Sequence, residues 1–363
     1  MKMKKHCSVV LLALWLFLTA FAWFRPSDAV SDSERRPLAQ MPQVSGESLI
    51  NGSFMEDFEA YSLDQFPLRD SFRTVKALFA THILGQKDNN GIYIANDYAV
   101  KQEYPLNPDS VQRAAERFTY VYEKYLTDSR AFFAIVPDKG QYLAEESGHL
   151  TLPFGKMNSI AGNAMPWATP INLYDSLNYE DFYRTDTHWR QENLFEAAKI
   201  ICDALNVTAP DRADFTRRDI DRPFYGVYYG QAALPMEPDV LSVMESPMLS
   251  ECTVYDHESG KTAAVYDESK LESKDLYDIF LSGSRSLLTI VNPGAKTDRE
   301  LIVFRDSFGS AMIPLLLTDY AKVTVVDIRY IQPALLDRYI DFAGQDVLFL
   351  YSTLVLNNSE TIK

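Results

Sequence analysis

The chain has few of the residues from which metal sites and basic binding surfaces are built. It has three cysteines and five histidines among 363 residues, and they do not cluster, so we predict no metal site and no other cofactor. Lys and Arg number 35 against 50 Asp and Glu, which gives a net charge of −15. The sequence has no cluster of Lys and Arg residues that would form a basic stripe. Nucleic acid and other polyanions are therefore poor candidate partners.

One segment near the N-terminus lacks charge altogether. Basic residues within Met1–His6 precede an uncharged apolar run from Cys7 to Phe24. Such a run fits a short membrane span or the core of a signal peptide, for which Ala20-Phe21-Ala22 is a candidate cleavage site. Its length and the following Arg25 favour an uncleaved signal anchor over residues 1–24. We expect the rest of the chain to be extracytoplasmic and anchored to the cell membrane, with a cleaved, secreted form as the alternative.

Only two cysteines, Cys202 and Cys252, lie outside this leader. An exported chain could pair them in a disulfide, but the sequence does not show that their side chains meet. Two free buried thiols are the equal alternative.

The composition divides the rest of the chain into a linker and a folded domain. Residues 25–53, rich in Ser, Pro, Asp and Glu, are typical of a juxtamembrane linker, and we assign residues 54–363 to one domain. Its first segment, Phe54–Leu84, has helical spacing that Pro67 interrupts, which predicts two helices. A hairpin over 91–100, a helix capped by Asp109 or Ser110 and a buried strand over 131–136 follow.

The last quarter predicts the fold class. Strands over 301–304, 322–328 and 346–351 alternate with helices over 309–317 and 333–342, which implies right-handed crossovers and a parallel sheet. We therefore predict a three-layer α/β/α domain with a parallel central sheet. Residues 207–298 are irregular, and we interpret them as an inserted region of short strands and loops.

Two short segments offer the groups of a serine acyl-transfer site. Asp186 and His188 are separated by one residue and stand ahead of a predicted helix over 190–205, so an extended motif lets the carboxylate orient the imidazole. Ser307 follows a buried strand and precedes a helix, which predicts a hydroxyl at the carboxyl edge of the sheet. Free N–H groups at the start of that helix can stabilise an oxyanion, and Gly309 permits a close approach of the backbone. We predict Ser307 as nucleophile, His188 as general base and Asp186 as its orienting acid.

Each of these patterns also has an ordinary explanation. An Asp-x-His pair arises by chance in chains of this length, and a serine after a strand is common at a turn. His82, His149 and His257 are interpreted as surface or structural. Lys139 ends a strand at the active edge, where it contacts substrate or lies in a solvated turn. Tyr228 and its tyrosine neighbours either stack on sugar rings or belong to the core.

The two segments together resemble a known family. Tyr183-Arg184-Thr185-Asp186-Thr187-His188-Trp189, Phe304-Arg305-Asp306-Ser307-Phe308, the leader and the terminal 348–354 segment are similar to the DHHW family of bacterial exported proteins. That family resembles the SGNH-hydrolase-like alginate O-acetylation proteins. The resemblance implies an SGNH-like, flavodoxin-like domain that transfers acetyl groups to a cell-surface or secreted polysaccharide. It also implies a membrane-bound O-acyltransferase as the acetyl donor system.

The chain departs from the family pattern at several positions. Arg305 replaces the Gly of the common Gly-Asp-Ser form, and Arg190 stands where a Thr is usual. Gly226 and Asn357 are our candidates for the Gly and Asn of the SGNH signature, which makes Arg305, Gly226, Asn357, Lys139 and Tyr228 candidate oxyanion or substrate-binding residues. A carbohydrate acetylesterase of the same mechanism and a non-catalytic scaffold of a polysaccharide-modification complex are the alternative functions.

Overall fold

The computed structural model describes residues 2–31 and 33–363. Met1 of the predicted leader and Asp32 of the predicted linker lie outside the described residues. The chain divides into two compact units. The first comprises Met1–Asn90 and Tyr229–Pro235, and the second comprises Gly91–Tyr228 and Met236–Lys363.

The first unit is mainly helical. It contains α1 (Lys2–Phe24), α2 (Gly46–Ile50), α3 (Ser53–Asp64) and α4 (Arg69–Leu78), together with the short antiparallel pair β1 (Val30–Ser31) and β2 (Arg36–Pro37). The predicted break at Pro67 is confirmed, because α3 ends before it and Leu68 adopts a left-handed conformation as the N-cap of α4. Within the described part of the chain, no helix has the length and apolar character needed to cross a membrane.

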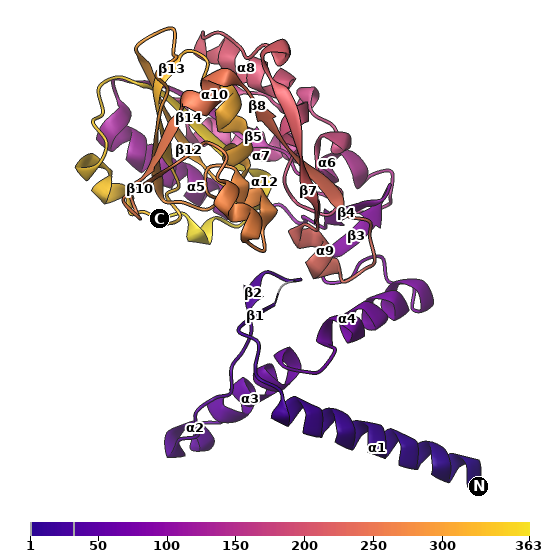
Figure 1. Ribbon diagram of the computed structural model, residues 1–363. Coiled ribbons are helices and arrows are strands. Elements are labelled where there is room, and N and C mark those ends of the chain that lie inside the picture. The colour runs from indigo at the N-terminus through magenta and orange to yellow at the C-terminus, as the bar shows by residue number, and fades with distance from the viewer. Residues whose placement is uncertain (1, 32) are drawn as a thin grey trace. The chain divides into compact units, whose positions relative to one another are not determined.

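An eight-stranded mixed sheet organises the second unit (Figure 1). Its order is β10-β9-β11-β13-β12-β14-β5-β6, and the five strands from β13 to β6 run parallel to one another. The bounds are β5 Arg130–Val136, β6 Thr169–Ile171, β9 Thr253–Asp256, β10 Lys261–Ala263, β11 Leu287–Val291, β12 Arg299–Arg305, β13 Tyr320–Val326 and β14 Asp346–Ser352. The parallel strands of the last quarter were predicted correctly.

The region predicted as an insertion contributes to this sheet, which corrects the sequence interpretation. β9, β10 and β11 extend the sheet antiparallel beyond β13. Val254, Leu288 and Ile290 are buried in the main core, so these short strands gain apolar burial only by joining the sheet. The same region also forms a separate antiparallel hairpin of β7 (Thr216–Phe224) and β8 (Asp239–Glu245), followed by α10 (Pro247–Glu251).

Helices cover both faces of the sheet, as expected for three layers. Alternate side chains of β5 enter two different cores: Phe132 and Ala134 point into one, Ala131 and Phe133 into the other. The first core includes α8 (Phe195–Leu205) and α11 (Phe308–Met312), and the second includes α5 (Pro108–Val121) and α7 (Phe154–Ala164). Burial on both faces explains why the central strands are continuous apolar runs.

Several predicted boundaries shift. α5 is capped by Asn107, whose side chain accepts the Ser110 N–H, and not by Asp109 or Ser110. The helix expected over 190–205 starts at Phe195 after a 3₁₀ turn, and the one expected over 333–342 is a 3₁₀ turn, Pro333–Arg338. The remaining elements are the predicted hairpin of β3 (Ile92–Ala95) and β4 (Tyr98–Lys101), and the short helices α6 (Gly140–Leu143), α9 (Val227–Ala232) and α12 (Thr353–Asn357). Cys202 and Cys252 are free, buried thiols.

Candidate active site

Ser307 lies in a tight turn between β12 and α11. Asp306 holds this turn, because its Oδ1 accepts the Phe308 N–H at 3.0 Å while its Oδ2 accepts the N–H and hydroxyl of Ser352 at 2.8 and 2.6 Å. Ser352 ends the neighbouring parallel strand β14. The turn is thereby fastened to the sheet, and Ser307 is partly exposed at its carboxyl edge, as the sequence predicted.

Asp186 and His188 lie in a loop that folds back on itself. Phe182 and Trp189 form an antiparallel bridge across its base, and the Tyr183 N–H donates to the His188 carbonyl at 3.0 Å. Within the loop, Asp186 Oδ1 accepts the His188 N–H at 3.0 Å. The extended conformation that we expected is therefore wrong: an aspartate that accepts the N–H two residues later forms a local turn.

This loop brings the three predicted groups together. His188 Nδ1 lies 2.6 Å from Asp186 Oδ1, and His188 Nε2 lies 2.7 Å from Ser307 Oγ. A carboxylate only accepts hydrogen bonds, so Nδ1 carries the proton and Nε2 is left to accept from the serine hydroxyl. Asp186 is fully buried, whereas His188 is 8% exposed. The three side chains form a hydrogen-bonded series of hydroxyl, imidazole and carboxylate, the arrangement that a serine nucleophile requires.

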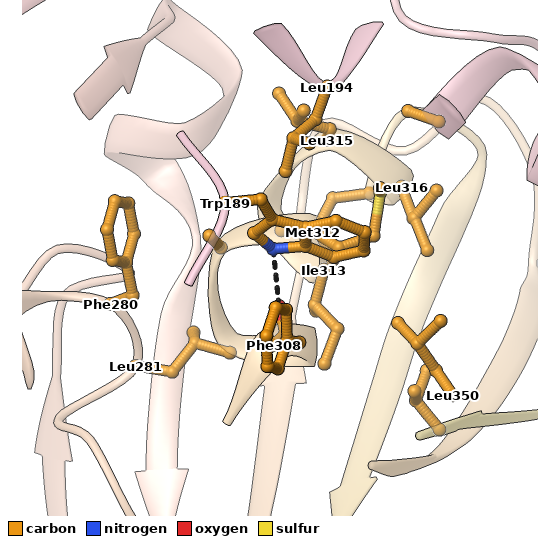
Figure 2. Packing of buried hydrophobic residues seen from close by; sticks show 14 of the residues in the cluster. Trp189, Leu194, Phe280, Leu281, Phe308, Met312, Ile313, Leu315, Leu316 and Leu350 are labelled. Atoms are coloured by element: carbon orange, nitrogen blue, oxygen red, sulfur yellow. Dashed lines mark hydrogen bonds between the residues drawn. The ribbon is translucent and has the colours of Figure 1, made fainter. Parts of the chain in front are cut away.

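Trp189 fixes the histidine loop to the helix that follows the serine. Its indole Nε1 donates to the Phe308 carbonyl at 3.0 Å, and the ring packs among the apolar side chains of α11 and the residues after it (Figure 2). Gln191 adds a second link, because its Nε2 donates to the Ala311 carbonyl at 2.9 Å. Both residues are fully buried. His188 and Ser307 are thus joined through a common core as well as through their own hydrogen bond.

The sequence did not reveal Tyr277, which covers the histidine ring. The Tyr277 and His188 rings stack with centroids 3.9 Å apart and planes 10° from parallel. Burial raises the pKa of Tyr277 well above its usual value, so the phenol stays neutral. It limits rotation of the imidazole without adding charge. Tyr277 lies in the segment interpreted as an insertion, where no local pattern marks it.

Gly226 lies against Asp186. A Cβ atom at this position would come within 2.2 Å of Asp186 Cβ, so only glycine fits. The Gly226 N–H donates to Thr185 Oγ1 at 2.9 Å, and the next N–H, from Val227, donates to Asp186 Oδ2 at 2.8 Å. Its place is therefore behind Asp186, where it lets the backbone approach the carboxylate, and not at an oxyanion site.

Lys139 and Tyr228, predicted as substrate contacts, are interior residues. Lys139 is fully buried and its Nζ donates to main-chain carbonyls of the Asp186 loop. The Tyr228 hydroxyl contacts Thr187 Oγ1 at 3.0 Å and Asp138 Oδ2 at 3.3 Å, and the residue is 2% exposed. Buried in this way, neither side chain can contact a polymer.

Arg305 and Asn357 also lie away from any substrate surface. Arg305 is fully buried: its Nη2 donates to the Gly283 carbonyl at 3.2 Å, and burial lowers its pKa. A Cβ atom on Gly309 would lie 2.7 Å from Arg305 Cβ, which explains the glycine there. Asn357 accepts the Asn107 N–H and donates to the Pro105 carbonyl, which ties α12 to the segment before α5.

One backbone donor of the serine turn is left for an oxyanion. The N–H groups of Phe308, Gly309 and Ser310 are engaged by Asp306 Oδ1, the Asp306 carbonyl and the Ser307 carbonyl. Within residues 2–31 and 33–363, the Ser307 N–H has no acceptor. It lies beside the nucleophile at the helix start, where negative charge is favoured.

The other histidines have structural contacts. His149 stacks on Tyr93 with ring centroids 3.6 Å apart, and His257 Nε2 lies 2.9 Å from Thr289 Oγ1. His82 lies in the first unit, beside Thr81. In the described part of the chain, no three His, Cys, Asp or Glu side chains gather in a group that could hold a metal ion.

The solved structures that this chain resembles come from bacterial proteins. A DHHW family protein from Eubacterium siraeum is 21% identical with a TM-score of 0.57, covering 76% of this chain and 95% of that one. Bacillus cereus PatB1 is 16% identical with a TM-score of 0.59, covering 75% of this chain and 98% of that one. A structure of PatB1 with a sulfonyl adduct is 16% identical with a TM-score of 0.56, covering 73% of this chain and 95% of that one. The O-acetyltransferase domain of Pseudomonas putida AlgJ is 15% identical with a TM-score of 0.43, covering 74% and 92%.

The sequence comparison agrees with the fold. No protein of curated function matches this chain. The model of the DHHW protein family matches residues 151–326, a region that holds Asp186, His188 and Ser307. The resemblance predicted from the two motifs is therefore confirmed: over this region the chain matches the DHHW family model.

Proposed function

We propose that this protein transfers an acetyl group to a polysaccharide hydroxyl through an acetyl-serine intermediate on Ser307. The observation that carries the proposal is the series of two short contacts, 2.7 Å from Ser307 Oγ to His188 Nε2 and 2.6 Å from His188 Nδ1 to Asp186 Oδ1. This is the geometry that a serine needs to become a nucleophile near neutral pH.

The proposed reaction has two acyl-transfer steps. Ser307 Oγ attacks the acetyl carbonyl while its proton moves to His188 Nε2; the donor's leaving group then departs with that proton, which leaves an acetyl ester on Ser307. In the second step, an acceptor hydroxyl gives its proton to Nε2 and attacks the carbonyl of the acetyl ester. Ser307 Oγ then takes the proton from Nε2 as its bond to the acetyl group breaks. Asp186 stabilises the imidazolium in both steps, and the Ser307 N–H is available to the oxyanion.

The choice of a polysaccharide acceptor rests on the family. The Asp-x-His motif precedes the serine, as in the SGNH-like alginate O-acetylation proteins that the DHHW family resembles. A membrane-bound O-acyltransferase is the donor system that we propose. The reaction of water in place of the sugar hydroxyl is the acetylesterase alternative.

We place this reaction outside the cytoplasm. The support is the leader itself, in which basic residues precede an uncharged run, a pattern typical of exported chains. Anchoring through residues 1–24 is part of the proposal. Protease accessibility of the chain in intact cells, followed by carbonate extraction of membranes, tests export and anchoring separately.

The proposal is tested with the full chain purified in mild detergent. A chromogenic acetyl ester is supplied with and without an oligosaccharide acceptor, and intact mass spectrometry follows the acetyl adduct. We expect an adduct on Ser307 and its transfer to the acceptor, with neither in Ser307→Ala or His188→Ala. Acetate release without acetylated sugar would identify an esterase. Equal background from wild type and both variants would contradict catalysis and favour the scaffold.

A further inference from the structure

A buried lysine lies beneath the loop that carries Asp186 and His188. Lys139 follows β5 and is fully buried. Its Nζ donates to the main-chain carbonyls of Tyr183 at 2.6 Å, Arg184 at 3.3 Å and Asp186 at 2.6 Å. Within the described residues, no carboxylate oxygen lies within ion-pair distance of Nζ. A buried ammonium that has no direct counter-charge is costly, so its role must be sought in the loop that it binds.

The N–H groups of the ammonium match the carbonyls of this loop in number and in direction. It has three N–H donors, and three carbonyls of one short segment converge on it. Carbonyls of an extended chain point to alternate sides, so they can converge on one point only if the chain turns. Lys139 therefore stabilises the bent conformation of residues 183–186, which presents Asp186 to His188. The Val227 N–H holds the Asp186 side chain from the other side.

We propose that Lys139 is a positioning residue of the catalytic triad, which holds the Asp186 loop in the bent form that orients His188 toward Ser307. The proposal rests on the proposed serine mechanism. Lys139 touches no reacting atom; it acts through the main chain of Asp186. A loop displaced by about 1 Å lowers catalysis on the order of 10²-fold.

The surroundings of the ammonium also imply a pH limit. Burial lowers the pKa of Lys139 to about 8, an effect opposed by the nearby carboxylates. The groups that face it are Asp138 beside it, Asp186 in the bound loop, Asp239 of β8, and the rings of Tyr98 and Tyr228 at 5.7 and 5.2 Å. Above that pH the neutral amine has two N–H groups for three carbonyls, so one carbonyl loses its donor and the loop loosens.

The first test compares two Lys→Met variants of the full chain. A sulfonyl fluoride reports nucleophile activation by sulfonylating Ser307 with loss of fluoride, and intact mass gives the rate. We expect Lys139→Met to react on the order of 10²-fold more slowly than wild type. The control Lys199→Met, at an exposed helix position, should react at the wild-type rate. Circular dichroism establishes that both variants are folded. Wild-type reactivity and an unchanged pH profile in folded Lys139→Met would overturn the proposal.

The second test needs no variant and decides the matter if Lys139→Met does not fold. In wild type, the ¹⁵Nζ resonance of Lys139 and the downfield Nδ1 proton of His188 are followed by NMR against pH. We expect both resonances and the labelling rate to change in one step near pH 8. An Nδ1 proton unaffected by titration of Lys139 would contradict the proposal. No labelling of Ser307 in wild type would contradict the serine mechanism instead, while the Nδ1 proton still reports whether Lys139 holds the loop.

Discussion

The two halves of the candidate site are built differently. The nucleophile turn is held by its neighbours in the sheet: Asp306 accepts from Phe308 two residues on and from Ser352 at the end of the adjacent strand. The acid–base loop has internal hydrogen bonds, but it is also held by three groups from elsewhere in the chain. These are the Lys139 ammonium, the Val227 N–H and Asp239, which accepts the N–H groups of Arg184 and Thr185.

This difference means that the acid–base loop depends more than the nucleophile turn on residues elsewhere in the second unit. The contacts of Asp306 lie within the serine turn and at the end of the adjacent strand, so this turn forms where those elements form, with one further link from the Trp189 indole to the Phe308 carbonyl. A loop held by distant groups keeps its form only while each of them is in place. We therefore expect substitutions far from Ser307 in sequence to disturb His188 more than they disturb the nucleophile turn.

The largest effect should come from the nucleophile itself. Ser307→Ala removes the hydroxyl that lies 2.7 Å from His188 Nε2, and we expect acyl transfer to fall roughly 10⁴- to 10⁶-fold. The matched control is Ser310→Ala on the same helix, whose buried hydroxyl has no partner among the described residues. Ester turnover measures both. Comparable losses in the two variants would mean that the helix, and not the nucleophile, had been damaged.

The next largest effect compares a glycine beside the acid–base loop, Gly226, with a glycine beside the nucleophile turn, Gly309. In Gly226→Ala the new Cβ would lie within 2.5 Å of three Asp186 atoms, backbone included, so the acid must move; we expect a loss of activity on the order of 10²-fold. Gly309→Ala meets the Arg305 side chain at 2.7 Å or more, and we expect a smaller loss, about tenfold. Gly162→Ala, with its nearest atom at 3.8 Å, is the control. A larger loss in Gly309→Ala than in Gly226→Ala would reverse the comparison.

The same difference explains what the sequence could and could not predict. Ser307 could be placed because a continuous apolar strand, a serine and a helix are visible within a dozen residues. Lys139 was predicted to contact substrate or to lie in a solvated turn, and Tyr228 was left between a sugar-stacking and a core position. The loop that buries both comes from more than 40 residues away in the sequence, so local patterns could not decide. Tyr277 had no local signal for the same reason. Short strands were predicted in this region, but their pairing with the central sheet was missed, because β9 to β11 are short and lie between loops.

A smaller effect is expected at Asp239, which holds the start of the acid–base loop. Its carboxylate accepts the Arg184 N–H at 2.9 Å, the Thr185 N–H at 2.8 Å and the Thr185 hydroxyl at 2.6 Å. Asp239→Asn keeps one acceptor oxygen, so we expect about 1–3 kcal/mol lower stability and roughly tenfold lower activity. Urea unfolding and ester turnover measure the two.

The control for Asp239→Asn is Asp221→Asn on the partner strand β7, at an exposed position. This variant should match wild type in both measurements. A full-activity Asp239→Asn would show that the loop keeps its form without this anchor.

The smallest effect on catalysis is expected at Glu103, which contacts neither half directly. It is buried and accepts the Thr353 hydroxyl at 2.9 Å, and burial raises its pKa from 4.5 to about 8. The unfolded chain therefore loses this proton near pH 4.5 while the folded chain keeps it to about pH 8, so stability falls as pH rises through that window. Glu103→Gln stays neutral and should be about 1–3 kcal/mol more stable than wild type above pH 8, with little difference below pH 4.5.

Urea unfolding measured against pH tests this prediction, with the exposed Glu116→Gln as the control variant. Parallel stability curves for Glu103→Gln and wild type would contradict the predicted effect of the Glu103 proton on stability. An altered pH profile of ester turnover in Glu103→Gln would contradict the expectation that Glu103 has little effect on catalysis.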